Sequence, residues 1–254
     1  MSWHVLPTDL FAFLLIFARI GAAMVLLPGV GEAVVPPRLR LLFALGMSAV
    51  LLPALGPTLP RMPADVGGLG LVLGTEIVIG AFLGTVARLV MAALEVTGMV
   101  IGYQSALSNA LFPDPSTTQG GAFASGFLMV LGLVLVFATD LHHVLFRGLA
   151  GSYALFEPGE VPPLGEMAEA VTRVVSRSFL LGVQLAAPFI LVGLVFSLGS
   201  GLLARLMPQI QVFFIVMPVQ ISLGFVVLLS TISGVMLWFL DAFAETVSGA
   251  LFSG

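Results

Sequence analysis

The sequence contains no cysteine and no lysine, and it has few charged residues of either sign. Without cysteine there is no disulfide, no thiolate metal site and no cysteine nucleophile. Charged residues make up 9% of the 254 positions, whereas a typical soluble domain carries about 25%. Thirteen acidic and nine basic side chains cannot cover a globule of this size. The net charge is −4, and the sequence contains no run of basic residues. These shortages exclude an ordinary soluble enzyme, a disordered chain and a nucleic-acid-binding protein.

Long apolar runs take the place of the missing charge, and 59% of the residues are hydrophobic. A helix that spans a bilayer needs about 20 predominantly apolar residues. Three runs are free of charge, at 115–139, 178–204 and 206–240, and weaker ones lie at 10–27, 41–55, 66–87 and 89–107. We therefore predict an all-α polytopic integral membrane protein. It has about six to seven apolar helices in a single domain, residues 1–254.

Two connections between the apolar runs stand out by composition. Residues 112–121 form the most polar stretch of the first half and include Pro113 and Pro115. Residues 157–169 contain four acidic residues and three prolines. Proline-rich and acidic composition of this kind is typical of a loop, so we predict that 157–169 is exposed to water.

Three charged side chains interrupt the apolar runs: Arg19, Glu76 and Glu95. Placing one such charge at the centre of a bilayer costs about 2.5–3.5 kcal/mol. We therefore expect these side chains to face the interior of the helical bundle, water or each other. Two interpretations stay open. One is a substrate or proton pathway. The other, which we favour, is a buried Arg–Glu pair or a protein that does not lie at the normal depth in the membrane.

Closely spaced glycines occur at Gly70/Gly74, Gly80/Gly84 and Gly98/Gly102. GxxxG spacing lets two helix backbones approach closely. The partner helix can belong to the same chain or to another subunit, and spacing alone does not separate these two cases.

No motif in the chain assembles a nucleophile, a base and an oxyanion donor, and we predict neither enzymatic activity nor a cofactor. His142 and His143 are adjacent, so on a helix their side chains are expected to point about 100° apart and not to share a metal ion. Together with Asp140 they are interpreted as the end of a helix at the membrane interface. We predict no metal site.

The most informative stretch lies at 205–224, where two prolines ten residues apart break the longest apolar run. Three glutamines replace the leucines that a simple span would have. A continuous helix facing lipid tolerates this composition poorly, so we predict a helical hairpin or a kinked pair of helices whose polar groups are satisfied by protein neighbours. The residues of interest are Pro208, Gln209, Gln211, Phe213, Pro218 and Gly224.

This stretch resembles the signature of the FliR family of flagellar export-gate proteins, which is shared with a counterpart in virulence type III secretion. The resemblance covers nearly the whole chain and departs from the family at Gln211, where many members have Asn. It extends to other segments, namely Phe17-Ala18-Arg19-Ile20-Gly21, Pro28-Gly29, Pro36-Pro37-Arg38-Leu39-Arg40, Glu76 with Gly80 and Gly84, Gly102-Tyr103-Gln104 and Phe112-Pro113-Asp114-Pro115.

The resemblance implies broken helices that pack into a hetero-oligomeric channel in the bacterial inner membrane, at the flagellar basal body. The implied partners are FliP-like and FliQ-like subunits, an FlhB-like subunit, membrane lipid and the unfolded flagellar proteins that are exported. It also implies that the central loop plugs the closed pore. By position this loop includes Phe112, Pro113, Asp114, Pro115, Gly120 and Gly121.

A small secondary transporter is the alternative function. The intramembrane charges and broken helices favour it, because such helices often form binding sites near the bilayer midplane. No convincing inverted repeat supports it. Whether the export system builds a flagellum or a virulence needle is not specified by these patterns, although the match to flagellar members favours the flagellum.

Overall fold

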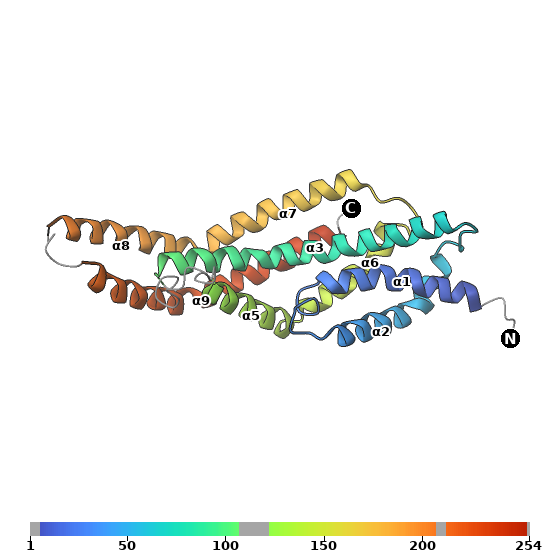
Figure 1. Cartoon of the computed structure of the whole chain (residues 1–254), viewed down its shortest axis with the longest axis horizontal. Coiled ribbons are helices and arrows are strands. Elements are labelled where there is room, and N and C mark those ends of the chain that lie inside the picture. The colour runs from blue at the N-terminus through green and yellow to red at the C-terminus, as the bar shows by residue number, and fades with distance from the viewer. Residues whose placement is uncertain (1–5, 107–121, 207–211, 253–254) are drawn as a thin grey trace. The chain divides into compact units, whose positions relative to one another are not determined.

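All regular structure in the described part of the chain is helical. The computed structural model describes residues 6–106, 122–206 and 212–252. The prediction of an all-α membrane protein is confirmed, because among the described residues five helices are long and apolar enough to cross a membrane, or six if α5 and α6 form one broken span. The helices are α1 (Leu6–Leu26), α2 (Pro37–Leu55), the short η1 (Gly56–Thr58), α3 (Val66–Gln104), α5 (Ala122–Ala138), α6 (Leu141–Leu155), α7 (Leu164–Leu185), α8 (Ala187–Leu206) and α9 (Val212–Phe252) (Figure 1).

The two predicted spans 66–87 and 89–107 are one helix, α3, of 39 residues. The only charge between them is Arg88, which lies on the exposed side of the helix. A single polar side chain on an exposed face does not interrupt the backbone hydrogen bonds, and the sequence between the two runs contains no proline. Merging these two spans accounts for the lower number of membrane-spanning helices.

The predicted span 178–204 is divided between α7 and α8, which break at Ala186. Pro188 follows the break, has no N–H to donate and would clash with the carbonyl of the residue four positions earlier. The backbone N–H groups of Phe189 and Ile190 both donate to the carbonyl of Ala186, at 3.0 and 3.1 Å, and so begin α8. α7 also begins earlier than expected, at Leu164, so the connection before it is shorter than 157–169.

From Val212 onward, the 206–240 run is a single helix, α9, which continues through Pro218. The hydroxyl of Ser222 donates to the carbonyl of Pro218 at 2.9 Å. Upstream, α8 ends at Leu206 and α9 begins at Val212. Pro208, Gln209 and Gln211 lie between them, outside the described residues.

The chain forms two compact units, and each is built from segments that are distant in sequence. Unit 1 comprises Met1–Val90, Thr139–Val175 and Ala244–Gly254. It contains α1, α2, the first part of α3, and α6. Its core includes Leu15, Ile16, Ile20, Met24 and Ile79, which have no exposed surface.

Unit 2 comprises Met91–Ala138 and Ser176–Phe243. It contains the last part of α3, α5, α8 and most of α9. Phe239 and Phe243 are fully buried, with ring centroids 5.9 Å apart. Gly98 lies so close to Ser125 that a Cβ atom would overlap the backbone of α5. α3 and α5 are therefore in direct backbone contact within this unit.

Candidate functional site

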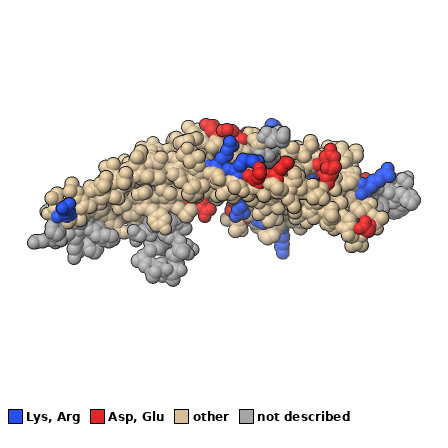
Figure 2. Space-filling view, turned by 90° about the horizontal axis from the view of Figure 1, so that it is seen from above, with Lys and Arg blue, Asp and Glu red and all other residues tan. Residues whose placement is uncertain are grey.

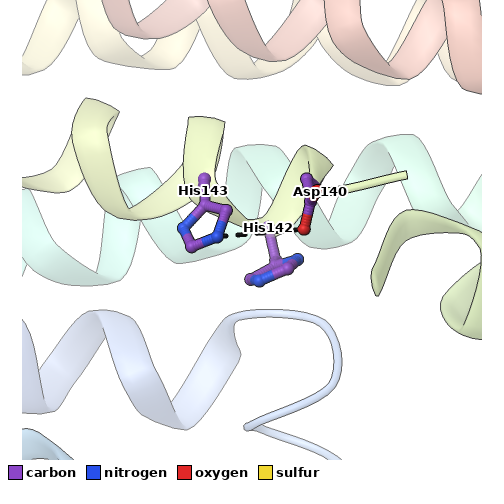
Figure 3. A group of neighbouring side chains, drawn as sticks. All are labelled: Asp140, His142 and His143. Carbon is purple, nitrogen blue, oxygen red and sulfur yellow. Dashed lines mark ion pairs between the residues drawn. The ribbon is translucent and has the colours of Figure 1, made fainter. Parts of the chain in front are cut away.

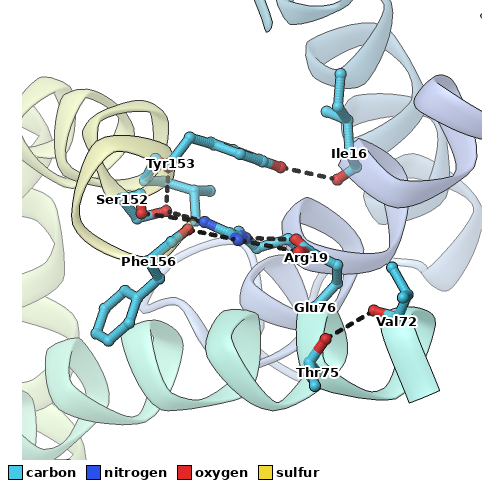
Figure 4. Close-up of polar contacts among 9 residues, drawn as sticks. Ile16, Arg19, Val72, Thr75, Glu76, Ser152, Tyr153 and Phe156 are labelled. Atoms are coloured by element: carbon cyan, nitrogen blue, oxygen red, sulfur yellow. Dashed lines mark hydrogen bonds and ion pairs between the residues drawn. The ribbon is translucent and has the colours of Figure 1, made fainter. Parts of the chain in front are cut away.

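Arg19 and Glu76 form a fully buried ion pair in unit 1. Arg19 lies on α1 and Glu76 on α3, and neither side chain has any exposed surface. The Arg19 Nε donates to Glu76 Oε2 at 2.6 Å, and the Arg19 Nη2 donates to Glu76 Oε1 at 3.0 Å (Figure 4). This is the bidentate arrangement in which a planar guanidinium binds both oxygens of a carboxylate.

Helix α6 and Phe156, the residue that follows it, supply the remaining partners of the guanidinium. The Arg19 Nη1 donates to the carbonyl of Ser152 at 3.1 Å and to its hydroxyl at 3.2 Å, and Nη2 donates to the carbonyl of Phe156 at 3.1 Å (Figure 4). An arginine has five N–H donors, and each of them has a partner here. The charge is therefore buried with complete hydrogen bonding.

Tyr153 covers the guanidinium from one side. The Arg19 Cζ lies 4.0 Å from the centre of the Tyr153 ring, within the range of a cation–π interaction. The Tyr153 hydroxyl donates to the carbonyl of Ile16, on α1, at 3.4 Å. One aromatic side chain thus contacts both the charge and the helix that carries it.

Two glycines of α3 bring α1 close enough for this pair to form. A Cβ atom at Gly80 would collide with the carbonyl oxygen of Arg19, and one at Gly84 would lie 2.8 Å from the carbonyl oxygen of Ala23. Gly80 follows Glu76 by about one turn of helix. The same backbone approach that excludes a side chain at Gly80 places the Arg19 side chain beside Glu76.

The hydrogen bonds occupy every donor of the guanidinium and reach both oxygens of the carboxylate. Both carboxylate oxygens accept hydrogen bonds, all five guanidinium donors are used, and both side chains are sealed from solvent. A site that binds and releases a solute needs an accessible polar group. The geometry therefore fits a structural connection between α1, α3 and α6.

Glu95 does not take part in this network. It lies in unit 2, on the exposed side of α3. Its backbone carbonyl accepts a hydrogen bond from the Ser125 hydroxyl at 3.1 Å. Of the three charges in the apolar runs, the structure brings together Arg19 and Glu76 and leaves Glu95 on the surface.

A second set of polar contacts surrounds the end of α3 in unit 2. The Gln220 Nε2 of α9 donates to the carbonyl of Gln104 at 2.8 Å. A Cβ atom at Gly193 of α8 would collide with the Gln104 side-chain oxygen, and one at Gly224 of α9 would collide with the Ser105 side chain. The motif residue Gly224 therefore has a role in packing, because the absence of a side chain lets Ser105 lie against α9.

Of the other motif residues, the structure describes Pro218 and the backbone of Phe213. Pro218 lies inside α9, and Phe213 belongs to the first turn of the same helix, where its side chain is not described. The six loop residues Phe112, Pro113, Asp114, Pro115, Gly120 and Gly121 lie outside the described residues.

The expectation that His142 and His143 point apart is wrong. Their ring centroids are 4.2 Å apart, with an angle of 35° between the ring planes. Both residues lie in the first turn of α6, after Asp140, which adopts a left-handed conformation with φ of 60°. The 100° step between neighbouring positions describes where side chains leave the helix, and rotation about the side-chain bonds brings these two rings together.

Sequence reasoning missed Ser152 and Tyr153, although they complete the site. The sequence did not distinguish them, because both occur in a short amphipathic helix, where serine and tyrosine are common. The only available indication was that an intramembrane arginine requires more hydrogen-bond acceptors than one glutamate supplies.

Many large apolar side chains of the described residues are exposed. Only 11% of the residues in the candidate spans of α2 and α8 are buried. On the face seen in Figure 2, charged residues are confined to small groups within an otherwise uncharged surface. Exposed apolar faces of this extent require lipid or other helices to cover them.

These features define a class: a multi-pass helical membrane protein in which the two buried charges, Arg19 and Glu76, pair with each other. The family described as bacterial export proteins, family 1, matches residues 10–246. The chain belongs to this family, the FliR family of type III export.

Three relatives illustrate the similarity. The flagellar biosynthetic protein FliR of Caulobacter vibrioides is 40% identical over 231 residues, covering 91% of this chain and 92% of the relative. FliR of Bacillus subtilis is 27% identical, covering 94% and 93%. The Yop proteins translocation protein T of Yersinia pestis is 25% identical over 65% of this chain and 64% of its own. The chain is therefore a multi-pass membrane component of a type III export apparatus.

Proposed function

We propose that this protein is a non-enzymatic subunit of the flagellar type III export gate in the bacterial inner membrane, at the flagellar basal body. With FliP-like and FliQ-like subunits it forms the channel for unfolded flagellar proteins and helps to nucleate assembly of the basal body. An FlhB-like subunit is a further partner. Residues 1–254 act in this complex as a single FliR-like membrane domain.

The observation that carries the proposal is the similarity to a flagellar relative along almost the full length of both chains. The virulence-system relative is less similar and is matched over a shorter part of the chain. This difference favours the flagellar system over a virulence needle.

The exposed helices support a role in a larger assembly. Exposed large apolar side chains on α8 include Leu191, Leu194, Val195, Leu198 and Leu202. They occur at spacings of three and four residues, with Val195 beside them, and so form a broad stripe along the helix. We propose that helices of neighbouring subunits cover this stripe.

The loop 112–121 is proposed to plug the closed channel. It carries a bulky apolar side chain, Phe112, beside prolines that restrict its backbone. Gly120 and Gly121 directly precede α5 in the sequence, and glycine is the residue type with the fewest restrictions on its backbone. The family resemblance supports this role.

The transporter alternative receives no support from the buried pair. Alternating access requires a site that solvent reaches from each side in turn. Arg19 and Glu76 are both fully buried, so solvent reaches neither charged group in this structure.

Site-directed cross-linking tests the proposed assembly directly, since the chain has no cysteine of its own. Leu198→Cys on α8 and Val50→Cys on α2 place single thiols at side chains that are 68% and 77% exposed. Co-expressed with FliP-like and FliQ-like subunits, both variants are expected to form cross-links to a partner subunit. Ala23→Cys, at a buried position on α1, is the matched control and is expected to form none. Absence of partner cross-links at either exposed position, with the chain present as a monodisperse monomer, would count against the export-gate assembly.

A further inference from the structure

Asp140, His142 and His143 gather at the start of α6. Each offers one ligand atom, and the three atoms all lie within 4.8 Å of one another (Figure 3). We propose that these residues bind a divalent first-row transition metal ion, with Zn²⁺ as the occupant. The site is separate from the Arg19–Glu76 pair and independent of the proposed export function.

The chemistry of the donors selects this class of ion. Two imidazole nitrogens and one carboxylate oxygen are ligands that Zn²⁺ accepts, and a set of three protein ligands with one open position is common in zinc proteins. Ca²⁺ and Mg²⁺ prefer sets made entirely of oxygen atoms. The two histidines therefore favour a transition metal over these harder cations.

The conformation of Asp140 directs its carboxylate toward the histidines. Aspartate at the residue preceding a helix usually accepts a hydrogen bond from the first turn, but the Asp140 side chain makes no such bond. Its Oδ1 lies instead 3.9 Å from the His143 Nε2, which is beyond hydrogen-bonding distance. The His143 backbone N–H donates to the Asp140 carbonyl at 3.0 Å and holds this turn together.

Small side-chain movements are enough to close the site. Zinc binds nitrogen and oxygen at about 2.0–2.2 Å, so two ligand atoms on a tetrahedral ion lie roughly 3.3–3.6 Å apart. The side chains of Asp140 and His143 are 77% and 59% exposed and can rotate to reach these distances. Their exposure also leaves the remaining coordination position open to water.

The ring of His142 is held by packing. It contacts the Phe146 ring edge-on, with centroids 6.2 Å apart, and Phe146 in turn contacts Phe43 of α2 at 5.6 Å. One of the three ligands is thus already positioned within unit 1. The positive end of the helix dipole disfavours a cation at this place, and the charge of the Asp140 carboxylate offsets that effect.

A bound ion would stabilise the first turn of α6. This helix also carries Ser152 and Tyr153, which contact Arg19. Because Zn²⁺ would bind the folded helix and not the unfolded chain, its addition is expected to raise the melting temperature.

Metal titration of the full-length chain tests the proposal. The protein is purified in detergent with a tag that contains no histidine, and Zn²⁺ binding is followed by calorimetry, with Co²⁺ as a spectroscopic probe. One ion per chain is expected. Asp140→Asn and His143→Ala are each expected to weaken binding by at least about 10-fold, since loss of even a hydrogen-bond partner of a ligand costs that much.

Two control variants separate this site from adventitious binding. His4→Ala removes the only other histidine in the chain, and Asp241→Asn removes an exposed carboxylate on α9. Both are expected to bind Zn²⁺ as the parent does, and all four variants are expected to melt as the parent does without metal. The proposal is overturned if the parent does not bind one Zn²⁺ ion, if Asp140→Asn and His143→Ala bind as tightly as the parent, or if the control variants weaken binding equally.

Discussion

At the scale of single residues, Arg19 explains how this chain accommodates a charge in an apolar helix. Its five N–H donors are all satisfied by Glu76, Ser152 and Phe156. A buried ion pair is not by itself strong evidence for stability, because desolvation opposes the attraction. Removing one partner is costly, however, because the other charge then remains buried without compensation.

Arg19→Ala is therefore expected to lower the free energy of unfolding by about 3–5 kcal/mol. Arg19→Lys is also expected to destabilise the protein, because an ammonium group has three donors and cannot bind the carboxylate through a planar fork. Chemical unfolding in detergent, followed by circular dichroism, measures both effects.

A double-mutant cycle identifies the partner. Combining Arg19→Ala with Glu76→Ala is expected to recover part of the loss, whereas Glu95→Ala is expected to be additive with Arg19→Ala, within about 0.5 kcal/mol. Strict additivity for Arg19 and Glu76 would contradict direct pairing.

Gln220 is expected to stabilise the protein although it is a polar residue in an apolar helix, because it donates a hydrogen bond to Gln104. Gln220→Leu leaves the Gln104 carbonyl, at the end of α3, without its side-chain donor, and this is expected to destabilise the protein by about 1–3 kcal/mol. Gln184→Leu, at an exposed position of α7, is the control, with an expected change of about 0.5 kcal/mol or less. If Gln220→Leu and Gln184→Leu melt at the same temperature, the hydrogen bond from Gln220 to the Gln104 carbonyl does not stabilise the protein.

At the scale of helices, the structure distinguishes between glycine pairs that look alike in sequence. Gly80 and Gly84 pack against α1 within unit 1, and Gly98 packs against α5 within unit 2. At Gly70 and Gly74, the described part of the chain places nothing within 4 Å of the position that a Cβ atom would occupy. The first group therefore serves contacts within the chain, and the pair Gly70/Gly74 is available to another subunit.

Gly80→Ala is expected to destabilise the isolated chain by at least about 1 kcal/mol, because the added methyl group forces α1 away from α3. Gly70→Ala and Gly74→Ala are expected to be neutral, or stabilising by up to about 1 kcal/mol, since alanine has the higher helix propensity. Thermal melting of the three variants in detergent measures these changes in stability. Destabilisation by Gly74→Ala as large as that by Gly80→Ala would show that Gly74 also has a neighbour within the chain.

At the scale of the whole molecule, both compact units are made of non-contiguous segments. α3, α7 and α9 each contribute residues to both units. A change that breaks one of these helices is therefore expected to affect both units. Large apolar side chains nevertheless remain exposed on several helices, in keeping with a subunit that is completed by partners or lipid.

Deletion of 113–119 tests the proposed plug at this scale. The complex is expected to assemble but to leak ions and small solutes, which would be seen as poor growth on induction and as raised conductance in reconstituted membranes. Deletion of 158–162, in the acidic connection before α7, is the control and is expected to leave conductance unchanged. An assembled complex that lacks 113–119 and conducts no more than the parent would assign the loop a connecting role.

The sequence by itself determined the class of protein. Scarce charge and long apolar runs are properties of composition, and they are sufficient to predict membrane helices because a helix in lipid satisfies its backbone within a single segment. The proline-containing stretch 205–224 was enough to predict the family, although not all of its residues are described. Helix ends were less predictable: Arg88 appeared to end a span but lies on the exposed side of α3.

Only the tertiary structure decided which residues meet. Arg19 binds Glu76 and Ser152, which are 57 and 133 positions away in the chain, and local periodicity contains no information about contacts at such separations. The choice of Glu76 over Glu95 follows from the close approach of α1 to Gly80. The meeting of His142 with His143 depends on rotation of their side chains. Residue spacing specifies the face of a helix, and packing of one helix against another decides what that face contacts.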